Sequence, residues 1–102
     1  MKLNNRHKEM IVQILNENLR SKCKIILYGS RYKGDAHSAS DLDLIIKSID
    51  GQAISKNELK QLHNSFIESH LPFRIDIRDY YSLPNYFLKY IDIANEDFYK
   101  NY

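Results

Sequence analysis

The sequence has little of several residues whose abundance would indicate a particular class of protein. Its 102 residues include one cysteine, two prolines, three glycines and no tryptophan. The single Cys23 excludes a disulfide framework and a cysteine metal cluster, and we expect it to be a small core residue at the edge of a strand. The length suits one compact domain, and no internal repeat or low-complexity segment interrupts residues 1–102.

The net charge is small, and long apolar runs are scarce. The net charge of +2 gives no concentrated basic face, so direct nucleic-acid binding is not expected. No apolar stretch is long enough to span a membrane, and the N-terminal segment lacks the uninterrupted apolar run of a signal peptide. These absences predict a cytoplasmic protein that does not associate with membranes.

Hydrophobic periodicity predicts alternating helices and strands. Apolar residues at three- and four-residue spacing predict an amphipathic helix over residues 4–20. The apolar runs 24–28 and 41–47, and the alternating segment 73–78, predict three strands. The element order is therefore α-β-β-α-β-α, an α/β (α+β) fold with a small mixed sheet of at least three strands flanked by helices.

Two further helices are predicted from their start signals. Ser55 followed by Glu58 fits a capping box, and this helix is expected to run to about residue 70. Ser82 and Pro84 begin a last helix. Its expected buried stripe is Phe87, Ile91, Ala94 and Phe98.

Carboxylates at alternate positions stand out in the second predicted strand. Asp41 and Asp43 project to one face of that strand, where they would repel each other unless a cation lies between them. Mg²⁺ takes oxygen ligands and leaves places for substrate phosphates. Asp76 lies opposite the apolar side chains of the third strand, and if this strand pairs with the second, the three carboxylates converge. Three carboxylates can hold two metal ions.

A glycine–serine pair ends the first predicted strand. Gly29 allows a tight turn and a close approach of phosphate, while the Ser30 hydroxyl and nearby backbone N–H groups suit a triphosphate tail. Arg31 and Lys33 add positive charge, and Gly34 relieves crowding in the following loop. A phosphate cradle joined to an acidic pair predicts a nucleoside triphosphate site.

These residues carry a family resemblance. Gly29-Ser30-Arg31, Gly34 and Ser40-Asp41-Leu42-Asp43-Leu44 together resemble the signature of the nucleotidyltransferase superfamily related to DNA polymerase β. The short chain is similar to the minimal members of that superfamily, called MNT domains. The resemblance covers nearly the whole chain and implies a single nucleotidyltransferase-fold domain that catalyses nucleotidyl transfer.

The resemblance also implies residue roles. Gly29 and Ser30 would bind the β- and γ-phosphates, and Asp41 and Asp43 would hold two Mg²⁺ ions. Asp76 would be the third carboxylate, next to the acceptor. The remaining residues assigned to nucleotide binding are Arg31, Lys33, Gly34 and Ser40.

The implied reaction is in-line attack of an acceptor hydroxyl on the α-phosphorus of ATP or another NTP, with release of pyrophosphate. Other interpretations stay open for single residues. Asp41 and Asp43 could form a structural cation site or a solvated strand face, and solvation explains Lys33 equally well. Arg74 and Arg78 share the predicted face of Asp76 and could contact nucleotide or balance its charge.

Three functions are compatible with this resemblance. MNT proteins are similar to the antitoxin half of bacterial toxin–antitoxin pairs, which implies transfer of AMP to a tyrosine of a helical HEPN ribonuclease. The alternatives are an antitoxin that acts by stoichiometric binding, and a small-molecule (aminoglycoside-like) nucleotidyltransferase that needs an accessory subunit. Because the chain has no room for further substrate-binding domains, either self-association or another polypeptide would complete the site.

Overall fold

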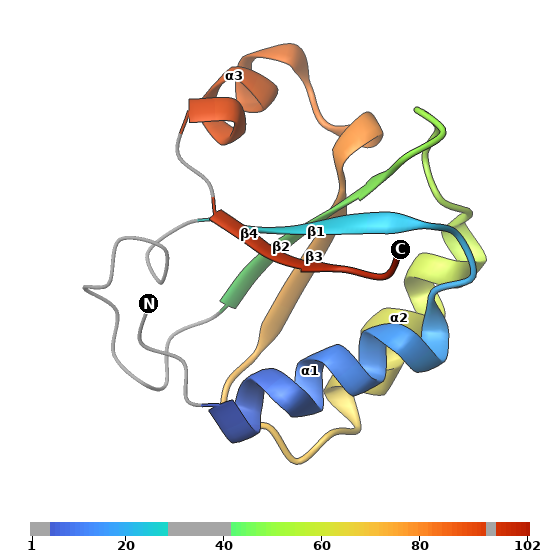
Figure 1. Ribbon diagram of the computed structural model, residues 1–102, viewed down its shortest axis with the longest axis vertical. Coiled ribbons are helices and arrows are strands. Elements are labelled where there is room, and N and C mark those ends of the chain that lie inside the picture. Colours follow the sequence, from blue (N-terminus) through green and yellow to red (C-terminus); the bar gives the residue numbers. More distant parts are fainter. Residues whose placement is uncertain (1–4, 29–41, 94–95) are drawn as a thin grey trace.

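A computed structural model describes residues 5–28, 42–93 and 96–102 (Figure 1). It contains three α-helices, four strands and one 3₁₀ helix. In chain order these are α1 (Asn5–Asn18), β1 (Cys23–Tyr28), β2 (Leu42–Ser48), α2 (Lys56–Ile67), β3 (Ile75–Asp79), the 3₁₀ helix η1 (Tyr80–Ser82), α3 (Asn85–Ile93) and β4 (Glu96–Lys100).

The strands form one mixed sheet in the order β3-β2-β1-β4. β1 is antiparallel to both of its neighbours, whereas β2 and β3 are parallel. A parallel pair needs a crossover connection, and α2 supplies it between β2 and β3. β3 is therefore the outer strand on one side of the sheet, and β4 is the outer strand on the other.

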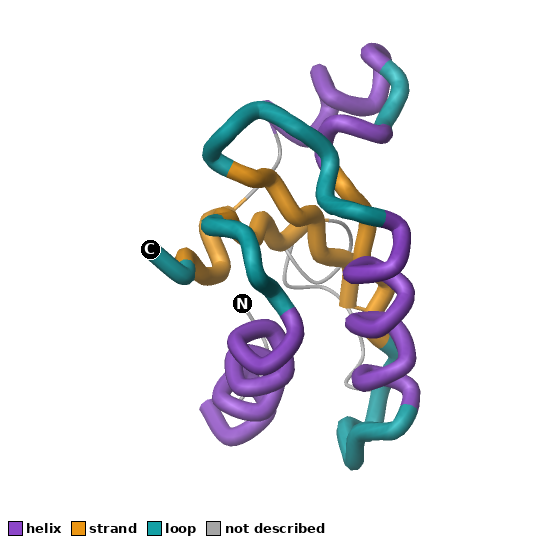
Figure 2. The backbone as a smooth tube through the Cα atoms, turned by 90° about the vertical axis from the view of Figure 1, so that its right-hand side faces the viewer, coloured by secondary structure: helices purple, strands orange, loops and turns teal. Residues whose placement is uncertain are grey.

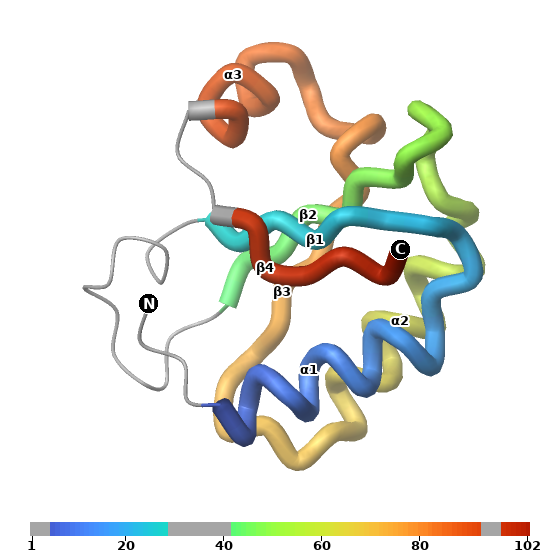
Figure 3. The backbone as a smooth tube through the Cα atoms, in the orientation of Figure 1, coloured from blue at the N-terminus to red at the C-terminus, as the bar shows by residue number. Residues whose placement is uncertain are grey.

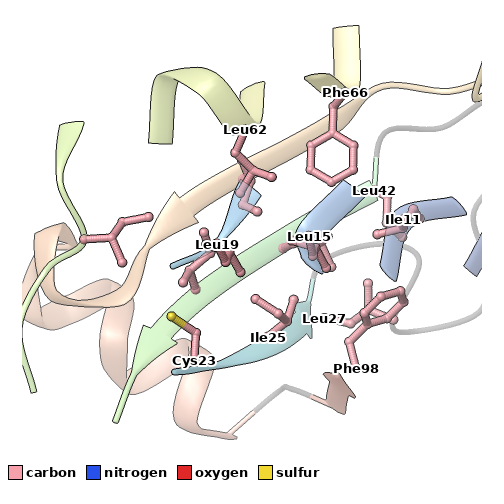
Figure 4. Close-up of a cluster of buried hydrophobic side chains, with 14 of the residues drawn as sticks. Ile11, Leu15, Leu19, Cys23, Ile25, Leu27, Leu42, Leu62, Phe66 and Phe98 are labelled. Carbon is pink, nitrogen blue, oxygen red and sulfur yellow. The ribbon is translucent and has the colours of Figure 1, made fainter. Parts of the chain in front are cut away.

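Helices lie on both faces of this sheet. α1 and α2 cover one face, and α3 lies over the other (Figures 1 and 2). The larger core lies under α1 and α2, where alternate residues of β1 and β2 meet Ile11, Leu15 and Leu62 from the two helices (Figure 4). Every second side chain of a strand points to the same face, which brings the apolar residues of the two strands together under the helices.

The opposite face carries a much smaller apolar cluster. Ile26 and Tyr28 of β1 and Ile45 of β2 pack there against Ile91 of α3. Because few side chains hold α3, most of this face is left for polar residues of β2 and β3. Asp43 and Asp76 lie on this face.

The predicted start of α2 is confirmed, and its acidic residue also reaches another element. The Ser55 side chain accepts a hydrogen bond from the backbone N–H of Glu58 at 3.1 Å, as a cap requires. The Glu58 carboxylate accepts from the backbone N–H of Arg20 at 2.9 Å. The cap of α2 thus ties this helix to the segment that follows α1.

The predicted element order is confirmed, but the prediction that the last helix extends to Phe98 is wrong. α3 ends at Ile93, Ala94 lies outside the described residues, and Phe98 belongs to β4. β4 lies beside β1 (Figure 3) and buries Phe98 in the larger core. Asn101 extends this pairing, since its side chain accepts from the Cys23 N–H and donates to the Ser21 carbonyl.

Candidate active site

Two of the three predicted carboxylates lie side by side. Asp43 of β2 and Asp76 of β3 are paired in register in the parallel ladder. Neighbouring strands are about 4.8 Å apart, so the two side chains leave the sheet next to each other. The condition set by the sequence, that the third strand pairs with the second, is therefore met.

Strand alternation explains why both carboxylates share a face. Leu42 and Leu44 flank Asp43 and are completely buried in the larger core. Ile75 and Ile77 flank Asp76 and contact the same core. Asp43 and Asp76 must therefore project toward the face that α3 partly covers, and both are only partly buried there.

A cation already lies against one carboxylate. The Arg78 guanidinium forms an ion pair with the Asp76 carboxylate at 3.3 Å and lies 5.9 Å from the centre of the Phe87 ring of α3. Arg78 is two residues after Asp76 in β3, so the predicted common face is confirmed for Arg78, whereas Arg74 precedes the strand. The ion pair is partly solvated, because about half of the Arg78 side chain is exposed.

Tyr28 completes this row of side chains, and the sequence analysis missed it. Tyr28 is the cross-strand partner of Asp43 in β1, so the order across the sheet is Tyr28, Asp43, Asp76. Burial raises the pKa of Tyr28 to about 12, with Arg78 lowering it and the two carboxylates raising it. The ring packs edge-on against Phe87 at 5.7 Å. The sequence does place Tyr28 on the same face of β1 as Ile26, two residues earlier. In the structure this is the face toward which Asp43 and Asp76 project.

Asp79, by contrast, is buried and forms hydrogen bonds within the fold. It is 3% exposed at the end of β3 and accepts from the backbone N–H of Ile54 at 3.0 Å and of Tyr81 at 2.9 Å. Its side chain caps η1, so both carboxylate oxygens are used in hydrogen bonds within the fold.

The other predicted site residues lie outside the described part of the chain. They are Gly29, Ser30, Arg31, Lys33, Gly34, Ser40 and Asp41. The ends of the segment that holds them are placed, because Tyr28 is the last residue of β1 and Leu42 is the first of β2. Since Tyr28 pairs with Asp43, the chain leaves β1 and returns to β2 beside the carboxylates.

The donor chemistry of this row fits magnesium. Carboxylate oxygens are hard ligands, and two carboxylates in register on a partly solvated face suit an ion that retains waters. Within residues 5–28, 42–93 and 96–102 no three potential His, Cys, Asp or Glu ligands gather. The described residues thus supply two predicted ligands, Asp43 and Asp76, and the third, Asp41, precedes β2 by one residue.

No helix in the described part of the chain is both long and apolar enough to cross a membrane.

Comparison with known proteins places the chain in a family. The family model described as "Nucleotidyltransferase domain" matches residues 8–98. A relative from Haemophilus influenzae, named "Probable protein adenylyltransferase MntA", is 37% identical over 71 residues. That match covers 69% of this chain and 60% of the relative, so the chain spans less than two thirds of the relative's length.

Solved structures share the fold. A crystal structure of a toxin–antitoxin with AMP-PNP superposes with a TM-score of 0.73 at 21% identity, covering 94% of this chain and 73% of the other. The structure of a tri-AMPylated Shewanella oneidensis HEPN toxin in complex with MNT antitoxin gives a TM-score of 0.69 at 15% identity. The superposition covers 95% of this chain and 72% of the other. At such identities the likeness concerns the fold alone. From the family match over residues 8–98, the chain belongs to the nucleotidyltransferase domain family.

Proposed function

We propose that this chain is a magnesium-dependent nucleotidyltransferase that transfers AMP from ATP to a tyrosine hydroxyl of a HEPN-family protein and thereby acts as an antitoxin. The observation that carries the proposal is the registered pair Asp43 and Asp76 on one sheet face, in a chain of this family. The choice of AMP as the transferred group is supported by the name of the Haemophilus influenzae relative, a probable protein adenylyltransferase. The choice of a HEPN-family partner is supported by the structural neighbour that was solved in complex with a HEPN toxin.

In the proposed site each group has one task. Asp43 and Asp76, with Asp41, would hold two Mg²⁺ ions, which supply neutralisation of the phosphate charge and activation of the acceptor hydroxyl. Gly29 and Ser30 would bind the β- and γ-phosphates, with Arg31, Lys33, Gly34 and Ser40 around them.

The bonds exchanged in the reaction are few. The acceptor oxygen forms a bond to the α-phosphorus, the bond from that phosphorus to the bridging oxygen breaks, and pyrophosphate leaves with the bonding electrons. The hydroxyl proton passes to the Asp76 carboxylate or to water. Tyr28 lies at the wall of this site, beside Asp43.

Intact-mass spectrometry tests the proposal. The protein and a candidate HEPN-family acceptor protein are incubated with Mg²⁺ and each of the four ribonucleoside triphosphates. We expect mass to be added to the partner in AMP-sized steps from ATP. Asp43→Asn should slow this at least about a hundredfold, since charge stabilisation in the transition state is lost.

A matched control separates catalysis from folding. Asp97→Asn makes the same substitution at an exposed aspartate of β4, which pairs with Lys24 at 3.2 Å. It should leave the transfer rate unchanged, and both variants should melt near the wild-type temperature. A partner that is silenced in a stable complex without added mass would refute transfer and favour an antitoxin that acts by binding.

A further inference from the structure

The order of strands indicates from which side of the sheet the acceptor would approach the nucleotide in the proposed reaction. β1, which leads into Gly29 and Ser30, lies on one side of β2, and β3 with Asp76 lies on the other. In an in-line displacement the attacking and leaving oxygens are on opposite sides of the phosphorus. If pyrophosphate leaves toward the end of β1, the acceptor oxygen must approach from the side of β3.

A cavity lies at that side of the molecule. Its volume is about 660 Å³, within the range of small-ligand sites, and it lies between the C-terminal part of α2 and the start of β3. We call it the β3-edge cavity and define it by Phe66, Ile67, Phe73, Arg74, Ile75 and Asp76. Asp76 lines this cavity and also belongs to the acidic pair, so the cavity and the pair share this residue at the outer edge of the sheet.

The walls of the β3-edge cavity suit an aromatic ring. Phe66 and Phe73 reach it from the core, and His7 of α1 packs edge-on against the Phe73 ring at 5.5 Å. Ile67 is 79% exposed, more than any other large hydrophobic side chain for which the structure gives an exposed value. An exposed isoleucine beside a cavity gains burial when a ligand covers it.

We infer that the β3-edge cavity is the acceptor subsite and that it receives a tyrosine side chain of the acceptor protein. This inference rests on the proposed transferase function. The ring contacts Ile67 and the two phenylalanines, and the phenol hydroxyl reaches toward Asp76. A serine or threonine acceptor would place little apolar surface against these walls. Bond exchange is that of the proposed reaction: the phenol oxygen joins the α-phosphorus and pyrophosphate leaves.

Methyl NMR of the full chain tests the cavity without requiring catalysis. Isoleucine δ1-methyl groups are labelled, and the protein is titrated with N-acetyl-tyrosinamide or, separately, with ATP and Mg²⁺. We expect N-acetyl-tyrosinamide to shift Ile67 and Ile75, while the exposed Ile49 stays unchanged as an internal control. ATP should leave the signals of Ile67 and Ile75 in place.

Kinetics with the acceptor protein give the second measurement. Ile67→Glu should raise the KM for the acceptor about tenfold and leave the KM for ATP unchanged, because a carboxylate replaces an apolar contact and its burial under the ring is unfavourable. Ile49→Glu is the matched control, because this isoleucine is also exposed but does not line the cavity. Both changes are at exposed positions, so both variants should fold.

The outcomes separate this inference from the proposed function. Shifts of Ile67 and Ile75 by ATP but not by N-acetyl-tyrosinamide would make the cavity a nucleoside site and overturn the inference. Shifts by neither compound would overturn it as well. If N-acetyl-tyrosinamide shifts both methyl groups but the wild-type protein transfers no AMP, the tyrosine site stands and the transferase function fails.

Discussion

At the scale of single residues, the chemistry of this protein concentrates in one row across three strands. Tyr28, Asp43 and Asp76 are cross-strand neighbours, and Arg78 is paired with the last of them. Two carboxylates at this spacing repel each other, and the guanidinium offsets part of that repulsion without a metal ion. Arg78 and a cation held by Asp76 would therefore compete for the same oxygens.

This competition predicts how an Arg78→Met variant behaves. Exposed ion pairs contribute at most about 1 kcal/mol, which corresponds to roughly fivefold in an equilibrium constant. We expect the variant to bind Mg²⁺ up to about fivefold more tightly, measured by isothermal titration with the metal alone. Lys24→Met removes a cation from the ion pair with Asp97 and should leave the affinity unchanged. Weaker binding in Arg78→Met would show that Arg78 supports the metal site.

Cys23 provides a prediction about pH. Burial, followed by the carboxylates of Glu58, Asp79 and Asp50, raises the pKa of its thiol from 9.0 to about 11. Because the folded pKa is the higher one, the neutral thiol stabilises the fold fully below pH 9, and this contribution is lost as the pH rises to about 11. The thiolate is the reactive form.

Alkylation by iodoacetamide measures this shift. The rate in the folded protein should rise with a midpoint near pH 11, against about 9 for the urea-unfolded chain. Equal midpoints in the two states would contradict a neutral buried thiol. Below pH 9 the folded protein should react only through transient unfolding.

At the scale of elements, α2 performs the connection that brings the two carboxylates into register. The helix crosses from β2 to β3 on the face of the larger core, and Leu62 and Phe66 bury its apolar stripe there. Ser55 caps the start of the helix. The hydrogen bond from the Arg20 N–H to the Glu58 carboxylate links the helix to the segment that follows α1. The placement of β3, and hence of Asp76, depends on this helix.

Ser55→Ala tests the local part of that arrangement. The variant leaves the backbone N–H of Glu58 without its side-chain acceptor, and we expect the free energy of unfolding to fall by about 1 kcal/mol in urea denaturation. Ser55→Asp keeps an acceptor oxygen and should retain most of the stability. An equal loss in both variants would assign the effect to something other than capping.

At the scale of the whole molecule, β4 closes the sheet on the side away from Asp76. It covers the outer edge of β1 and adds Phe98 to the larger core (Figure 4). Asn101 fastens the end of this strand to Ser21 and Cys23. Segments from the two ends of the chain thus support the strand that leads into the predicted phosphate loop.

Phe98→Ala measures the contribution of β4. Phe98 is 6% exposed, and truncating a buried phenylalanine costs about 3–5 kcal/mol in the free energy of unfolding. Tyr102→Ala, at an aromatic residue that is 55% exposed and only four residues later, should cost well under 1 kcal/mol. Thermal or urea unfolding of both variants gives the comparison, and similar losses would mean that Phe98 does not belong to the core.

The sequence by itself determined the features that depend on local periodicity. Alternation within β2 and β3 placed Asp43 and Asp76 opposite the apolar residues, and helical spacing and the Ser55 cap located α1 and α2. The motif that carries the family resemblance is also local, and the family match confirmed the family that the motif indicated.

Only the tertiary structure decided the features that depend on pairing between distant segments. The spacing of Ile91, Ala94 and Phe98 is compatible with a helix, and only the edge of β1 makes residues 96–100 a strand. The register of Asp43 with Asp76, the place of Tyr28 in that row and the cavity beside β3 likewise require elements to meet. The local sequence determines which face of the sheet a side chain points to. The residues that lie beside that side chain depend on which strands pair. Strand pairing depends in turn on how the whole chain buries its core.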